Sequence, residues 1–188
     1  MVARSVRERT VQAWVELRSE DPEARSAASV AERRLVAARG LTSLRRVRLY
    51  ELRGPLPARR SVEALLHRSI QFYNPHKERC WVRVGGRDPI PARPGEVAIL
   101  VADRDDERRP AAERWWEHQT GQRIEVREGV AWLASFGPDG DPAARAADLA
   151  VARDRQQGLF CNPHAQWHRV AAGTVPLPWF EAKEGSAR

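Results

Sequence analysis

The chain has 188 residues, of which 42% are apolar and 30% are charged, and this favours a folded protein over a disordered one. No apolar run approaches the roughly 20 residues that a membrane helix needs, and the N-terminus lacks the apolar core of a secretory signal, so we expect a cytoplasmic protein. The net charge is +7, and 30 of the 32 basic residues are arginine. Because carboxylates lie among these arginines, the charge alone does not indicate nucleic-acid binding.

Residues 10–84 predict strand, helix, strand, helix and strand in chain order. Apolar and polar residues alternate over 11–17, which is the period of a strand. Residues 22–39 have helical composition and end at Gly40, a typical C-terminal glycine. A strand is expected over 44–53, and 80–84 is extended. Between them an amphipathic helix carries one face spaced at i, i+3, i+4, i+7 and i+8, formed by Val62, Leu65, Leu66, Ser69 and Ile70.

Residues 85–96 hold three prolines and three glycines, which is typical of a linker. The next stretch, 97–172, predicts the same order of elements. It opens with the apolar run 97–102, a buried strand, and a helix over 105–118. Period-two alternation follows over 130–136. A second helix begins at Asp141, a good N-cap, with a shared face of Ala143, Ala146, Ala147, Ala150 and Val151; a short strand over 164–170 and a loop-like tail, 173–188, complete the chain.

A short motif occurs in both stretches, 88 residues apart. Asn74-Pro75-His76 follows Phe72, and Asn162-Pro163-His164 follows Phe160. Proline ends a helix and pushes the preceding residue into extended geometry. The structural interpretation is therefore a corner between a helix and an edge strand, kept in both copies of a duplicated α+β unit. Each unit is expected to be an antiparallel sheet with two helices on one face.

Two chemical interpretations of this motif compete with the structural one. Cys161, His164 and His168 have the side chains of zinc ligands, and His76 and Cys80 occupy corresponding places. In a strand, however, positions i and i+4 lie about 13 Å apart, too far for two imidazoles to share one ion. A catalytic role would need a base and an orienting group, and the two cysteines differ in position within the repeat. We therefore predict no metal, no cofactor, no catalytic residue and no disulfide framework.

The order of motifs resembles the PurS family, the small subunit of bacterial phosphoribosylformylglycinamidine synthase. The matching segments in the second stretch are VAILVADRD, RIEVREGVAWLASF and GLFCNPHAQWHRV; those in the first are VQAWVELRSEDPEA, RRVRLYELRG and IQFYNPH. Together they cover about residues 10–172. The polar run 153–158 departs from the family pattern, and two copies in one chain is unusual for it. Two fused units are instead similar to the N-terminal region of the long, single-chain form of the synthase.

This resemblance implies a bridging subunit of purine biosynthesis that is not catalytic alone. Its partners would be a PurQ-like glutaminase, which releases ammonia, and a PurL-like, ATP-dependent synthetase. The two units would pack as an internal pseudo-dimer, with further self-association left open. Trp14 lies opposite the apolar face of its strand, so we expect a second sheet to cover it. The candidate interface residues are Trp14, Arg46, Arg48, Tyr50 and Trp167.

Two other functions remain open from the sequence. One is a ferredoxin-like binding module for RNA or a regulatory ligand, with the Arg45-Arg46-Arg48-Tyr50 strand as its surface. The other is a small-molecule enzyme of the dimeric α+β barrel type, which would need a pocket lined by histidine and tryptophan. Tight, sequence-specific nucleic-acid binding would favour the first, and such a pocket would favour the second.

Overall fold

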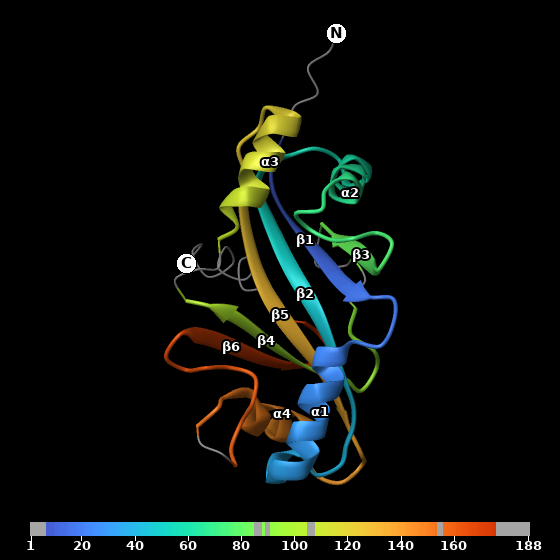
Figure 1. Cartoon of the computed structure of the whole chain (residues 1–188), viewed down its shortest axis with the longest axis vertical. Helices are drawn as coiled ribbons and strands as arrows, with labels where there is room; N and C mark the ends of the chain where they lie inside the picture. The colour runs from blue at the N-terminus through green and yellow to red at the C-terminus, as the bar shows by residue number, and fades with distance from the viewer. Residues whose placement is uncertain (1–6, 85–87, 89–90, 105–107, 154–155, 176–188) are drawn as a thin grey trace, which may run out of the picture.

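The computed structural model describes residues 7–84, 88, 91–104, 108–153 and 156–175. The six strands in this part of the chain form one sheet in the order β3-β1-β2-β5-β4-β6, and all neighbouring strands are antiparallel (Figure 1). The strands are β1 (Arg7–Leu17), β2 (Leu41–Leu56), β3 (Glu78–Arg83), β4 (Val97–Asp103), β5 (Glu125–Phe136) and β6 (Gln166–Ala172).

In the described residues, four α-helices and one short 3-10 helix connect the strands, so the predicted α+β class is confirmed. The helices are α1 (Pro22–Arg34), the 3-10 helix η1 (Val36–Ala38), α2 (Arg59–Arg68), α3 (Pro110–Thr120) and α4 (Pro142–Ala150). Asp21 and Asp141 cap α1 and α4 by accepting hydrogen bonds from backbone N–H groups of the first turn. Among the described residues, no helix is both long and apolar enough to cross a membrane.

Several helix ends differ from the sequence prediction. The helix expected over 22–39 breaks at Leu35, which has extended geometry between α1 and η1. Ile70 does not belong to the buried face of α2: Ser69 is already extended, and Ile70 is 87% exposed. In α4 the buried residues are Ala146, Leu149 and Ala150, so Leu149 takes the place expected for Ala147. The helix predicted from 105 begins at Pro110, and residues 105–107 lie outside the described part.

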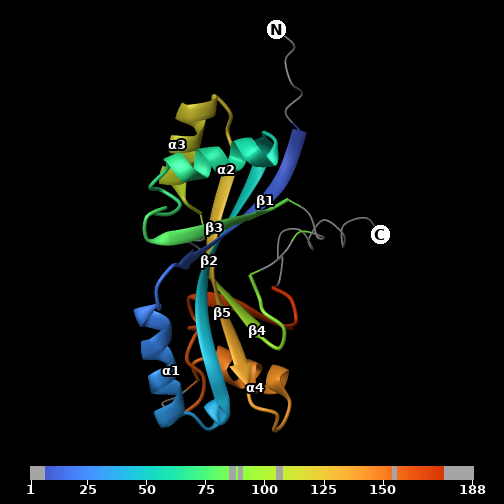
Figure 2. The same ribbon diagram turned by 90° about the vertical axis from the view of Figure 1, so that its right-hand side faces the viewer.

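All helices pack on one face of the sheet, and there each of two apolar clusters draws on both halves of the chain. One cluster joins α2 and strands β1 and β2 with Ala112 and Trp116 of α3. The other joins Ala31 and Leu35, at the end of α1, with α4 and strand β4. Figures 1 and 2 show α2 and α3 near one end of the sheet and α1 and α4 near the other. The helix that follows the first strand of each half therefore covers the core of the other half.

The opposite face of the sheet carries a third apolar cluster. Trp14, Leu49, Leu100 and Leu133 lie in it and are at most 1% exposed. Val175 belongs to the same cluster, and residues 176–188 of the tail lie outside the described part. The second sheet that we expected over Trp14 is not found in the described part of the chain, because its six strands all belong to one sheet. The two halves instead meet edge to edge along β2 and β5.

Candidate functional site

The arginines of β2 are the site that the sequence proposed for RNA, and Arg45 is the most enclosed of them. Its Nη1 donates to both carboxylate oxygens of Glu96 at 2.8 and 2.9 Å, and its Nη2 donates to Glu16 at 2.8 Å. The side chain of Glu96 is only 2% exposed. Burial lowers the pKa of Arg45, but the hydrogen bonds to the two carboxylates outweigh it and raise the pKa overall.

Arg46 points to the helix face of the sheet and holds the start of α1. It forms ion pairs with Asp21, the N-cap residue, and with Glu23 in the first turn. Its guanidinium group also lies over the ring of Trp132 on β5, with 6.0 Å to the ring centroid. Arg46 thus connects α1 of the first half to β5 of the second half.

Arg48 and Tyr50 form a polar network on the helix face where β2 and β5 meet. Arg48 donates to the Tyr50 hydroxyl at 2.7 Å and to Glu78 on β3 at 2.6 Å, and it lies 4.0 Å from Glu128 on β5. Glu128 in turn pairs with Arg109 at 3.1 Å. Burial, with help from the charge of Glu128, raises the pKa of Tyr50 far above its ordinary value. Tyr50 is fully buried and offers no surface to a partner.

These contacts bear on the RNA-binding interpretation. Arg45, Arg46 and Arg48 are each paired with two carboxylates, and none of their side chains is more than 27% exposed. Phosphate contacts need cationic groups that reach solvent. Arg45, Arg46 and Arg48 therefore connect elements of the fold, and their pairing gives the RNA interpretation no support.

The two tryptophans of the candidate interface lie on the face opposite the helices. Trp14 is fully buried among residues of both halves. Trp167 on β6 is half-buried at the margin of the same cluster. Trp14 therefore packs within the chain, whereas Trp167 retains exposed surface.

The two Asn-Pro-His corners make the same hydrogen bonds. The Asn74 side chain accepts from the backbone N–H of His76 at 3.0 Å, and Asn162 accepts from His164 at 3.1 Å. The side chain four residues after each asparagine accepts from the backbone N–H of that asparagine: Glu78 does so at 2.7 Å and Gln166 at 3.0 Å. Only the backbone of each histidine takes part in these bonds. This geometry gives a physical reason for asparagine, and for Glu or Gln four residues later.

Cysteine and histidine form no recognisable chemical site in the described part of the chain. No group of three or more His, Cys, Asp or Glu side chains there could hold a metal ion. Burial, with the charges of Glu63 and Glu78, raises the pKa of Cys80 to about 12. A thiol with such a pKa is a poor nucleophile near neutral pH. Cys161 is buried in the core beneath α4.

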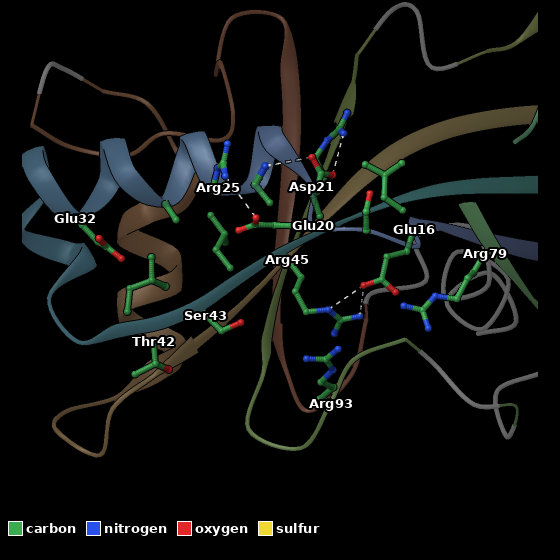
Figure 3. A pocket seen from close by; sticks show the side chains of 17 residues that line it. Glu16, Glu20, Asp21, Arg25, Glu32, Thr42, Ser43, Arg45, Arg79 and Arg93 are labelled. Atoms are coloured by element: carbon green, nitrogen blue, oxygen red, sulfur yellow. Dashed lines mark hydrogen bonds and ion pairs between the residues drawn. The ribbon is translucent and has the colours of Figure 1, made fainter. Parts of the chain in front are cut away.

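The sequence did not point to a groove beside α1, which has a volume of about 440 Å³. Arg45 of β2, Arg79 of β3 and Arg93 before β4 lie at one end of it together with Glu16 (Figure 3). Carboxylates nearer α1 line the other part, and Glu20 there pairs with Arg25 at 3.5 Å. A second cleft, with a volume of about 310 Å³, lies on the helix face beside Trp132 and Phe160. Glu23 and Gln166 are among the other residues that line it. The signal for the groove is weak in the sequence because its basic residues come from three separate segments.

We compared the chain with protein-family models, with curated proteins and with solved structures, and no match was found in any of the three comparisons.

Proposed function

We propose that this chain is a tandem duplication of a PurS-like unit whose halves form an internal pseudo-dimer. The observation that carries this proposal is the symmetry of strand order. Read from the outer edge to the centre of the sheet, the strands of the first half are β3, β1 and β2, and those of the second half are β6, β4 and β5. In chain order within each half these are the third, first and second strands. The central pair, β2 and β5, is antiparallel, as a two-fold relation requires. The matching corners at Asn74 and Asn162 support the same conclusion.

The crossing of helices supports the pseudo-dimer. α3 completes the apolar cluster of β1 and β2, and the end of α1 completes the cluster of β4. An exchange of equivalent elements is a common way for two copies of one unit to associate. In this protein the exchange takes place within one chain.

We infer an accessory role in the cytoplasm for this pseudo-dimer, in which it joins a PurQ-like glutaminase to a PurL-like synthetase and does no chemistry itself. The two ends of the sheet are related in architecture but not in sequence. α3 carries the half-buried Trp115 at the position where α1, counted from its own first proline, has Ala27. Two related but unequal ends suit a protein that must bind two different partners.

Reconstitution tests this role. The chain is mixed with a glutaminase, a synthetase, glutamine, ATP and formylglycinamide ribonucleotide, and amidine formation is followed. We expect glutamine-dependent turnover to require the chain, and size exclusion to show a complex of all three proteins. With ammonium chloride in place of glutamine, turnover should depend much less on the chain, because ammonia then needs no delivery from the glutaminase. Unchanged glutamine-dependent turnover without the chain, and no complex, would exclude the accessory role.

A further inference from the structure

We propose that the groove beside α1 binds a phosphate group through Arg79 and Arg93. Both residues line the groove, both are exposed, and each comes from a different segment. The side chain of Arg79 lies 5.7 Å from the ring centroid of Trp81, and neither guanidinium group forms an ion pair within the described residues. This proposal does not depend on the accessory role.

The charge at this end of the groove is unbalanced. Three guanidinium groups, those of Arg45, Arg79 and Arg93, share two carboxylates, Glu16 and Glu96. Arg45 donates hydrogen bonds to the carboxylates of both Glu16 and Glu96. Glu16 is the direct cross-strand partner of Arg79, yet its Oε1 atom accepts from Arg45. The net charge of these five groups is therefore +1, and an anion bound between Arg79 and Arg93 would lower the repulsion between them.

The geometry suits an oxyanion with several acceptor atoms. In Figure 3 the guanidinium groups of Arg45, Arg79 and Arg93 lie around the same part of the groove. A guanidinium group presents a planar fork of donors that matches two oxygens of a phosphate. Arg45 is already bonded to Glu16 and Glu96, so the two exposed arginines supply the positive charge and the donors for the anion. At about 440 Å³, the groove has room for a phosphorylated metabolite such as a nucleoside monophosphate.

Calorimetric titration of the full chain with pyrophosphate, at constant low ionic strength, tests the proposal. We expect binding with a dissociation constant below about 1 mM. Arg79→Gln and Arg93→Gln should each weaken binding by about tenfold or more, because each removes one charged donor fork. Arg34→Gln is the matched control, since Arg34 is an exposed arginine at the end of α1 that does not line the groove; this variant should bind like the parent.

A gain-of-affinity variant makes the test sharper. Glu16→Gln removes one negative charge from this end of the groove, so it should tighten binding, a result that mere loss of structure would not give. Parallel titrations with inorganic phosphate and adenosine monophosphate distinguish a free anion from a nucleotide as the source of the phosphate. The proposal is overturned by the absence of pyrophosphate binding at millimolar concentration, by equal loss in Arg34→Gln and the groove variants, or by binding of single-stranded RNA alone.

Discussion

Arg45 and Glu96 lie 51 residues apart in the chain, and one guanidinium nitrogen of Arg45 donates to both carboxylate oxygens of Glu96. The pair joins the first part of β2 to the residue that precedes β4. The backbone N–H of Arg93 donates to the same carboxylate at 2.6 Å, and the Pro91 carbonyl accepts from Arg45 at 3.3 Å. Residues 91–96, the described end of the segment between the two halves, are thus tied to β2 through the Arg45–Glu96 ion pair.

Removing one partner of this pair should destabilise the protein strongly. We expect Arg45→Met to lower the free energy of unfolding by about 3 kcal/mol, because the Glu96 carboxylate, 2% exposed, would lose its positive partner. Urea denaturation followed by tryptophan fluorescence measures this. The double variant Arg45→Met with Glu96→Met should recover part of the loss, since no unpaired buried charge remains at position 96.

Arg25→Met provides the control, because Arg25 and Glu20 form an ion pair with both side chains 70% exposed. Exposed pairs add little to stability, so this variant should unfold at nearly the same urea concentration as the parent. A loss of less than about 1 kcal/mol in Arg45→Met would contradict the argument.

The two corners should respond alike to mutation. Asn74→Ala and Asn162→Ala should each cost about 1 kcal/mol of stability, because each removes a side-chain acceptor for a backbone N–H. His164→Ala should cost almost nothing, since only the backbone of His164 takes part in the corner. Urea denaturation of the three variants decides the matter. A large effect of His164→Ala with no effect of Asn162→Ala would show that the corner is kept for chemistry rather than geometry.

The α+β class and the order of the elements could be predicted because they depend on local signals. Period-two alternation in β1 and the N-cap Asp141 are visible within a few residues. The end of α2 could not be located, because Ser69 and Ile70 continue the helical spacing although the backbone already leaves helical geometry at Ser69. Periodicity shows which face of a segment is apolar, and it does not show where the polypeptide backbone turns.

Contacts between residues far apart in the chain could not be predicted either, because periodicity does not show how the polypeptide backbone turns. The composition of residues 105–118 predicts a helix, but not that Trp116 packs against strands of the other half. The arginines of β2 suggested a surface for RNA, whereas their partners lie far away in the chain: Glu16 is 29 residues from Arg45. The candidate groove depends on three such distant segments. Its residues became recognisable only when the sheet register brought β3 beside β1.

Stability should fall at alkaline pH, in part because of Cys80. Its pKa is raised to about 12 by burial and by nearby carboxylates, whereas a thiol in the unfolded chain ionises near about 8.5. The folded state therefore favours the neutral thiol. The resulting stability is fully present below about pH 8.5 and is lost progressively as the pH rises toward 12. The raised pKa of Tyr50 acts in the same direction above its ordinary value of about 10.

Urea denaturation at several pH values between neutrality and strongly alkaline conditions checks this prediction. Cys80→Ala should lose less stability over that range than the parent, because it removes one of the groups that must ionise. Cys80 should also react slowly with a thiol reagent near pH 8 in the folded protein and rapidly after denaturation. Fast reaction of folded protein at Cys80, tested in a Cys161→Ser background, would contradict the raised pKa.

The crossing of helices makes the two halves depend on each other. In the full chain, Trp116→Ala should lower the free energy of unfolding by about 3–5 kcal/mol, because the fully buried indole of α3 fills a cluster built mainly from β1, β2 and α2.

A fragment that ends before β4 lacks this indole and leaves Ala31 and Leu35 of α1 without the core of α4. We therefore expect each half, produced alone, to be unfolded or to self-associate. Mixing the two halves should restore helical circular dichroism and a cooperative unfolding transition, since the helices can then cross between fragments as they do in the chain. A monomeric first half that unfolds cooperatively on its own would show that the exchanged helices are dispensable, and it would remove the main support for an internal pseudo-dimer.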